Sequence, residues 1–326
     1  MRARTLLGVG CAYAFIAAPA SIDDAEQVVG CLSSCVTKLN KREQCVDAAH
    51  REVSFEEEYA FGGTLAVRMV GELGLVRDAQ TAVDSPALQV ERYVNLVGRN
   101  LGAQSGRPND RWTFGVLEED PKDSAIRAFS TPGGYVFVSK TLLKRLDNEA
   151  QLAAVLAHEI AHVTEGHAIH QYQDVKASLC NTTFGTSLLE GPIADSLDLM
   201  IKVGSLVLDD EKNAKTLAKL TDDLASDVFN AGYSKPREFD ADRIGAQLMI
   251  YAGYNPYEMI LFLNRVPVDS AVLRNHPENK ERQDALRAWI KGYCASPDNM
   301  MSGDCPFTNY PSVQIPKDIK AAIAKL

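Results

Sequence analysis

The side chains most able to do chemistry together in this sequence are His158, Glu159 and His162. They form the pattern His-Glu-Ile-Ala-His in a stretch of helical apolar spacing that begins near Asn148, a residue typical of helix N-caps. Residues four apart share one face of a helix, so the two imidazoles can bind one Zn²⁺. Glu159 then lies beside the position where a water binds. The spacing therefore predicts a hydrolytic zinc centre rather than two isolated surface histidines.

A hydrolytic zinc site needs a third protein ligand and an open position. In one known pattern the third ligand is a histidine ten residues after the first histidine, and a glycine lies seven residues after it. Glu165 and Ala168 occupy these two positions after His158, so the sequence does not fit that pattern. Another solution is a glutamate on a later helix, followed four residues on by an aspartate that orients a ligand imidazole. Glu238 and Asp242 offer that pair.

The elements that must position these groups follow from hydrophobic spacing. Helices with one buried stripe are expected near residues 55–70 and 90–101. Aromatic and β-branched residues then predict strands at 112–117, 125–130 and 135–138, with a turn at 132–134. The helix that begins at Asn148 follows, then one from about 237 to 252 and another after Pro256.

Four stretches carry a resemblance to a known family: Ala128 to Gly134, Leu156 to Val163, Glu238 to Gly245, and His276-Pro277 with Arg282. The sequence resembles the gluzincin metallopeptidases of the HtpX, BepA and CAAX prenyl protease type, over roughly residues 55–289. It is more similar to the soluble periplasmic members than to the membrane-spanning ones. The resemblance implies an α+β fold, mainly helical and zincin-like, with a small antiparallel sheet and the HExxH motif on the active-site helix.

The resemblance implies the same site that the spacing suggests. It makes His158, His162 and Glu238 the zinc ligands, Glu159 the catalytic base and Asp242 the group that orients a ligand from behind. One Zn²⁺ per chain is expected.

The resemblance adds two catalytic groups near the metal, His276 and Arg282, which could bind the substrate or the developing oxyanion. In some relatives the equivalent histidine occupies the open position on the metal. Taken alone, His276 is also typical of a turn residue before a proline. Arg127 departs from the family pattern, which often has asparagine there, so a role for it at the substrate is not expected.

The function indicated is a zinc-dependent metalloendopeptidase that hydrolyses misfolded or unfolded cell-envelope proteins in proteolytic quality control. We expect strand 135–138 to be the sheet edge that holds an extended peptide by backbone pairing. The alternative is a zinc-binding chaperone or scaffold whose peptidase site is inactive or held closed, for example by His276. A purely structural zinc site fits poorly, because such sites usually fill all four positions with Cys or His.

The composition limits the classes of partner that the protein is expected to bind. A formal net charge of −9 speaks against a nucleic-acid binder, which needs a basic face. Hydrophobic residues at 46% and charged residues at 24% are typical of a soluble globular domain. No transmembrane span is expected in the mature chain, and peripheral association with a membrane stays open. Protein or peptide substrates are the partners expected, and the oligomeric state is not indicated.

The first twenty residues predict export. Arg2 and Arg4 precede an apolar stretch, residues 6–18, and cleavage of a signal peptide is expected after Ala20. Removal of this segment changes the formal charge from −9 to −11 and leaves six of the seven cysteines. A periplasmic or otherwise exported protein is expected. A lipoprotein modified at Cys11 is the rival interpretation.

The expected segments are a signal peptide at 1–20, a Cys-rich helical segment at 21–50, a zinc metallopeptidase domain at 51–290 and a C-terminal tail at 291–326. An even set of cysteines in an exported protein suggests disulfides. A local bridge between Cys294 and Cys305 is the favoured pair. The sequence leaves the pairing of the other cysteines open: Cys31, Cys35, Cys45 and Cys180.

Overall fold

The computed structural model describes residues 49–76, 84–118, 128–174, 233–265, 279–296 and 313–326, with six isolated residues: 43, 46, 47, 177, 307 and 310. The chain divides into two compact units, of which the larger comprises residues 54–169 and 225–326. In the smaller unit, Gln173 donates a hydrogen bond of 2.9 Å to the carbonyl oxygen of Arg51. The predicted cleavage site after Ala20 lies outside the described residues, as does His276.

The larger unit contains all the elements that follow. The helices are α3 (Phe55–Leu73), α4 (Pro86–Ala103), α5 (Lys140–Leu143), α6 (Glu149–Thr164), α10 (Lys235–Tyr251), α11 (Tyr257–Arg265), α12 (Asn279–Ala295) and α13 (Lys317–Lys325). The strands are β1 (Thr113–Leu117), β2 (Ala128–Thr131) and β3 (Tyr135–Ser139). The predicted α+β class is confirmed, and the predicted helices and strands occur in the expected order.

The sheet differs from the prediction in two respects. Its strand order is β1-β3-β2, with β3 parallel to β1 and antiparallel to β2, so the sheet is mixed rather than antiparallel. The strand expected at 135–138 is the central one and pairs on both sides, so the expectation that it is the substrate-binding edge is wrong. A chain segment can be added only to an edge strand, because only there is one row of backbone groups not already paired within the sheet.

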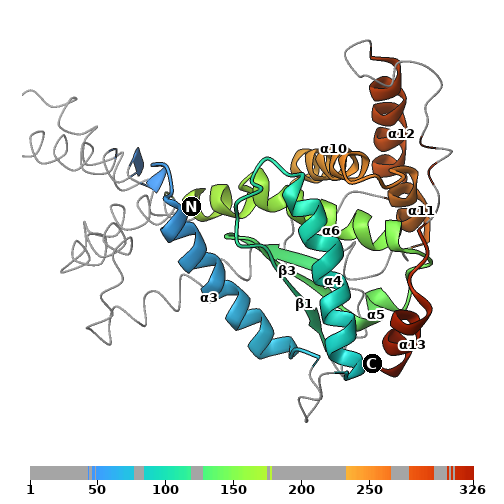
Figure 1. Ribbon diagram of the computed structural model, residues 1–326. Helices are drawn as coiled ribbons and strands as arrows, with labels where there is room; N and C mark the ends of the chain where they lie inside the picture. The colour runs from blue at the N-terminus through green and yellow to red at the C-terminus, as the bar shows by residue number, and fades with distance from the viewer. Residues whose placement is uncertain are drawn as a thin grey trace, which may run out of the picture. The chain divides into compact units, whose positions relative to one another are not determined.

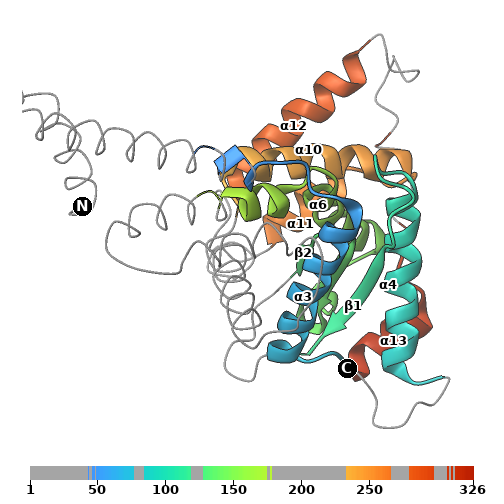
Figure 2. The same cartoon turned by 90° about the vertical axis from the view of Figure 1, so that its left-hand side faces the viewer.

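Different helices cover the two faces of the sheet. Val136 and Val138 of β3 belong to the main core with α4 and α6, whereas Phe137 packs on the opposite side with α3. Successive side chains of a strand point to opposite faces, which accounts for this alternation. Both views place the strands between α3 and α4 (Figures 1 and 2).

The turn between β2 and β3 lies directly against α3. Gly133 and Gly134 have φ angles of 78° and 90°, which glycine adopts readily. A Cβ added to Gly62 of α3 would lie 1.7 Å from the carbonyl oxygen of Pro132. Thr131 also donates a hydrogen bond of 2.9 Å to the carbonyl oxygen of Gly62. The position of β2 therefore depends on this glycine contact.

Helix α6 is buried along nearly its whole length and contacts α4, α10, α11, β2 and β3. It begins as predicted, since the Asn148 side chain accepts a hydrogen bond of 2.9 Å from the backbone of Gln151. Tyr93 and Tyr254 hold its first turn by donating to Glu149, at 2.7 and 2.8 Å. His158, Glu159 and His162 therefore stand on a buried helix that five other elements hold in place.

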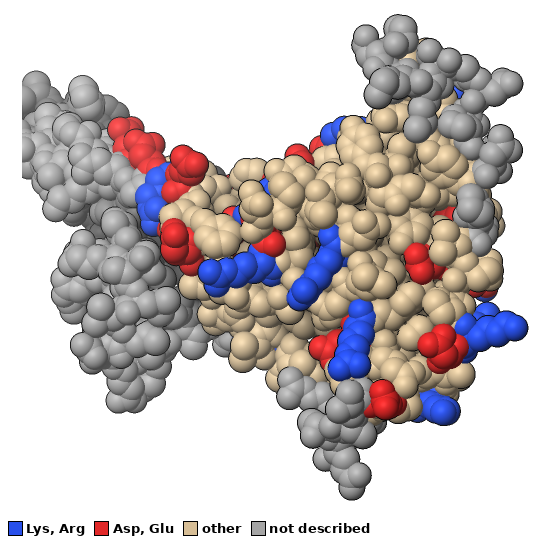
Figure 3. Space-filling view, viewed as in Figure 1, with Lys and Arg blue, Asp and Glu red and all other residues tan. Residues whose placement is uncertain are grey.

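Surface charges of both signs are interspersed on the face shown in Figure 3, over the residues that the structure describes. Among these residues, no helix has the length and apolar composition that a membrane crossing requires. Cys294 is buried and disulfide-bonded, but its proposed partner Cys305 lies outside the described residues, so this pairing stays a prediction.

Candidate metal centre

Helix α6 presents His158, Glu159 and His162 at one place on its surface, with exposed fractions of 7%, 7% and 2%. Helix α10 packs across this point so closely that a Cβ added to Gly245 would lie 3.0 Å from the backbone nitrogen of His158. Glu238 precedes Gly245 by seven residues and therefore lies on the same helix face. The close approach of the two helices brings its carboxylate to the imidazoles.

Three side chains converge as the sequence predicts. The Nε2 atoms of His158 and His162 lie 3.0 Å apart. The Glu238 carboxylate lies 3.4 Å from Nε2 of His158 and 3.6 Å from Nε2 of His162. Tetrahedral coordination with bonds of about 2.0–2.1 Å spaces two ligand atoms by roughly 3.3 Å. Two imidazole nitrogens and one carboxylate at these separations fit a single metal ion.

Asp242 lies behind His158 and fixes its ring. Its Oδ1 is 2.9 Å from Nδ1 of His158, which leaves Nε2 directed to the cluster. Arg282 of α12 in turn donates two hydrogen bonds to the Asp242 carboxylate, of 2.6 and 2.7 Å. Asp242 and Arg282 are 2% and 4% exposed, so this ion pair is buried.

These contacts set the pKa values of the site. Burial lowers the pKa of the His158 imidazole, but hydrogen bonds with Asp242 and Glu238 outweigh it and raise the value to about 9. Burial raises the pKa of the Asp242 carboxyl, but the charge and hydrogen bonds of Arg282 bring it to about 2. Without metal, His158 is therefore protonated at neutral pH, and a metal ion must displace that proton.

Glu159 is held from the sheet side. The hydroxyl of Ser130 in β2 donates a hydrogen bond of 3.0 Å to its Oε2. Among the strands that the structure describes, β2 lies at one end of the sheet and contacts α6, so the carboxylate lies on the side of α6 that faces this strand. A general base in this position is within reach of both a metal-bound ligand and a peptide along β2.

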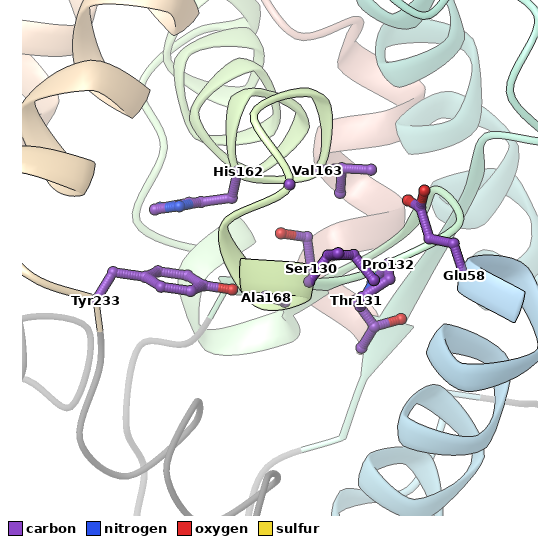
Figure 4. Close-up of a pocket in the computed structure, with 10 residues that line it drawn as sticks. Glu58, Ser130, Thr131, Pro132, His162, Val163, Ala168 and Tyr233 are labelled. Carbon is purple, nitrogen blue, oxygen red and sulfur yellow. The ribbon is translucent and has the colours of Figure 1, made fainter. Parts of the chain in front are cut away.

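Two residues that the sequence did not single out complete the surroundings of His162. His167 is buried, and its Nδ1 lies 2.8 Å from Nδ1 of His162. The Tyr233 ring stacks on His162 at 4.3 Å between centroids. Figure 4 shows Tyr233 and His162 along one side of a pocket, with Ser130 near its centre. The concentration of three of the chain's six histidines within ten residues was the available signal for His167.

The remaining predicted residues have different outcomes. Arg282 is near the cluster, and its guanidinium is engaged with Asp242. His276 lies outside the described residues, so its predicted role stays a prediction, and Arg127, for which no role at the substrate was expected, lies outside them too.

A mainly helical α+β fold, in which an HExxH helix meets a glutamate from a later helix, defines the gluzincin class of metallopeptidases. The chain belongs to peptidase family M48, whose model matches residues 88–290. The predicted family resemblance is thereby confirmed.

Three relatives illustrate the similarity. The beta-barrel assembly-enhancing protease of Escherichia coli strain K12 is 28% identical over 222 residues, which are 66% of this chain and 41% of that protein. The protein of the same name from Yersinia pestis is 27% identical, over 71% of this chain and 42% of its own length. The mitochondrial metalloendopeptidase OMA1 of Schizosaccharomyces pombe is 26% identical, over 70% of this chain and 60% of its own length. The chain thus spans less than half the length of the bacterial relatives.

Proposed function

We propose that this protein is a zinc-dependent metalloendopeptidase that cleaves misfolded or unfolded proteins of the cell envelope. The observation that carries the proposal is the convergence of His158, His162 and Glu238 beside Glu159. The names of the relatives support it, because one refers to a protease of β-barrel assembly and another to a metalloendopeptidase.

Zinc is the metal that the donor set favours. Two imidazoles and one carboxylate, with a position left for water, are the ligands of catalytic zinc in several peptidases. Zn²⁺ held there supplies a Lewis acid that polarises the scissile carbonyl and lowers the pKa of water to about 7. We assign the metal-binding role to His158, His162 and Glu238.

Glu159 is the proposed general base. It takes a proton from the attacking water and delivers it to the amine that leaves, and the Ser130 hydroxyl keeps its carboxylate oriented throughout. Proton transfer in both steps requires the same carboxylate to face water and substrate. The position of Glu159 between the cluster and β2 supports this role.

Arg282 acts through Asp242 in this proposal. Its two hydrogen bonds fix the carboxylate that orients His158, so we assign it a positioning role rather than the direct contact with substrate suggested by the family resemblance. His276 remains the candidate for contact with the substrate or the oxyanion.

Strand β2 is the proposed substrate-binding edge. It pairs with β3 on one side, and no other described strand pairs with its second side. An extended peptide added there lies beside Ser130 and Glu159. Backbone pairing is insensitive to most side chains, so unfolded segments of many proteins are suitable substrates.

Export is the proposed route to this substrate. We infer a signal peptide at 1–20 cleaved after Ala20, a Cys-rich segment at 21–50, a peptidase domain at 51–290 and a tail at 291–326. A periplasmic location agrees with the relatives named for β-barrel assembly, whereas other relatives are named as mitochondrial. N-terminal sequencing of the exported protein tests the cleavage site, and a mature chain that retains residues 1–20 contradicts it.

Cleavage of unfolded casein tests the peptidase proposal. We expect Glu159→Gln to lower the rate by about 10²–10⁴-fold while zinc content stays at the wild-type level. Glu165→Gln is a matched control, because Glu165 follows the same helix and is exposed. Full activity in Glu159→Gln contradicts the mechanism. A wild-type protein that binds zinc and casein without cleavage supports the scaffold alternative instead.

A further inference from the structure

Glu58 of α3 is a buried carboxylate, 8% exposed, that does not belong to the metal cluster. Both of its oxygens accept hydrogen bonds from the guanidinium of Arg107, at 2.8 and 2.9 Å. We propose that Glu58 and Arg107 form a clamp that holds strand β2 at a fixed distance from the active-site helix α6. The proposal rests on the peptidase function and deepens it, since it identifies two residues that position the catalytic base relative to the substrate.

Glu58 fixes the turn that follows β2. Its Oε1 accepts a further hydrogen bond, of 3.1 Å, from the backbone nitrogen of Gly133. Gly62 lies one helical turn later on the same face of α3, and its carbonyl oxygen accepts the hydrogen bond of Thr131. Figure 4 shows Glu58 next to Thr131 and Pro132 in the wall of the pocket. One face of α3 therefore holds both the last residue of β2 and the turn after it.

Arg107 connects this turn to the end of α6. Its Nη1 donates a hydrogen bond of 3.3 Å to the carbonyl oxygen of Val163, in addition to its bond with Glu58. Val163 directly follows the proposed metal ligand His162 and lies in the last turn of α6. The last four carbonyls of a helix have no partner within the helix and are stabilised by a nearby cation. One guanidinium therefore joins α3, the turn after β2 and the end of α6.

The segment after α4 fixes the position of this guanidinium. The backbone nitrogen of Arg107 donates to the Ser105 hydroxyl at 3.2 Å, and its carbonyl oxygen accepts from the Trp112 indole at 3.2 Å. The Nε atom lies 2.8 Å from the carboxylate of Asp110. A planar guanidinium that is paired in two directions is held in one orientation. The clamp therefore has a defined length, which an exposed ion pair between flexible side chains does not have.

The clamp joins the same two elements as the contact between Ser130 of β2 and Glu159 of α6. Gly133 follows β2, and Val163 lies four residues after Glu159 on α6. Loss of the clamp therefore leaves β2 attached to α6 by fewer contacts. A displacement of about 1 Å at a reacting group can lower a rate by about 100-fold. A peptide paired with β2 moves together with the strand, so we expect the clamp to affect kcat more than KM.

The test compares the cleavage kinetics of zinc-loaded variants on a fluorogenic peptide that contains a cleavage site mapped in unfolded casein. Glu58→Gln keeps the size of the side chain and leaves Arg107 paired with Asp110. Arg107→Lys keeps the charge but loses the planar fork. We expect each variant to lower kcat by about 10–100-fold and to change KM by less than about threefold. Zinc content is expected to stay at the wild-type level, and either variant decides the question if the other fails to fold.

Hydrogen exchange gives a readout that does not depend on catalysis. The amides of residues 130–134 are expected to exchange faster in Glu58→Gln than in the wild type, whereas those of residues 154–162 in α6 stay protected. A double-mutant cycle with Ser130→Ala gives a second readout. If the clamp acts through β2, the effects of Ser130→Ala and Glu58→Gln on kcat are less than additive. A general loss of stability would instead speed exchange in both segments.

Two matched controls change exposed charges close to the clamp. Glu56→Gln lies in the first turn of α3, and Arg111→Met lies in the loop that also contains Arg107. Both are expected to leave kcat and exchange unchanged. Wild-type kcat in a folded variant of Glu58 or Arg107, or unchanged exchange at residues 130–134, overturns the clamp alone. A loss of zinc does the same, because the pair would then hold the metal ligands rather than β2. Absence of any zinc-dependent cleavage by the wild type overturns the peptidase function and this proposal together.

Discussion

At the scale of single residues, the metal cluster depends on groups that do not bind the metal. Asp242 and Arg282 form a buried ion pair whose carboxylate holds His158. Such a pair contributes little relative to apolar residues, but loss of one partner leaves a buried charge without compensation. The geometry of the site is therefore sensitive to residues one contact away from the metal.

Arg282→Met tests this sensitivity. We expect it to lower the free energy of unfolding by about 3–5 kcal/mol, because the Asp242 carboxylate is left buried without its guanidinium. Arg287→Met on the same helix is the matched control, since the Arg287 side chain is 53% exposed near Asp284 and should change the free energy by less than about 1 kcal/mol. Urea denaturation measures both. Equal effects of the two variants would show that the buried pair has no special importance.

The buried His167 makes the stability of the metal-free protein depend on pH. Burial, with a smaller effect of the Arg237 charge, lowers the pKa of His167 to about 4, whereas an unfolded histidine titrates near 6.5. The unfolded chain therefore binds more protons between pH 6.5 and 4, and stability falls as the pH is lowered through that window. We expect the metal-free protein to show this slope in urea denaturation and His167→Gln to reduce it.

Two other shifted groups at the site, His158 and Asp242, act outside this window. The His158 pKa of about 9 affects stability between pH 6.5 and 9, where stability is lost as the pH rises. The Asp242 pKa of about 2 affects it below about pH 4, where stability is lost as the pH falls. An unchanged slope between pH 6.5 and 4 in His167→Gln would contradict the assignment to His167.

The sequence predicted the residues whose contacts follow from helix periodicity. His158, His162, Glu238 and Asp242 are separated by four residues within their pairs, so each pair lies on one helix face whatever the rest of the fold does. The contacts of His167 depend instead on how the chain turns after α6. No local periodicity of the sequence determines that geometry. Helix register therefore gave no reason to predict His167 as part of the site.

At the scale of elements, the contact of α3 with the turn before β3 positions the substrate edge. Gly62→Ala introduces a Cβ in a space that the Pro132 carbonyl already occupies, and we expect a loss of about 1–3 kcal/mol in stability. Gly71→Ala in the same helix meets no atom within 4 Å and should stabilise by up to about 1 kcal/mol. Thermal unfolding measures both. Similar changes in the two variants would contradict the close contact.

The element types were predictable, but their arrangement in the sheet was not. Alternating apolar residues identify 135–138 as a strand, and the turn residues Pro132 to Gly134 identify its connection to β2. The pairing of β3 with β1 joins segments about twenty residues apart and leaves no local pattern. The sequence therefore placed β3 at an edge, whereas long-range pairing places it at the centre.

At the scale of the whole molecule, the main hydrophobic core includes helix α13, which lies in the segment proposed as a tail. Helix α13 packs on α4, and Ala322 and Ile323 are buried in the main core. We expect Ile323→Ala to lower stability by about 2–5 kcal/mol. Lys320→Ala, on the exposed side of the same helix, should stay within about 0.5 kcal/mol. Chemical denaturation measures the free energy of unfolding of both variants. If α13 were a peripheral tail, both Ile323→Ala and Lys320→Ala would change it only slightly.

The central claim is that one zinc ion binds where His158, His162 and Glu238 converge. Native mass spectrometry after zinc loading and removal of excess metal tests it most directly. We predict one zinc per chain in the wild type and in Glu159→Gln. We predict a loss of zinc in Glu238→Gln, because the third ligand loses its charge. A wild type that binds no zinc, or a Glu238→Gln variant that retains it at the wild-type level, would contradict the account.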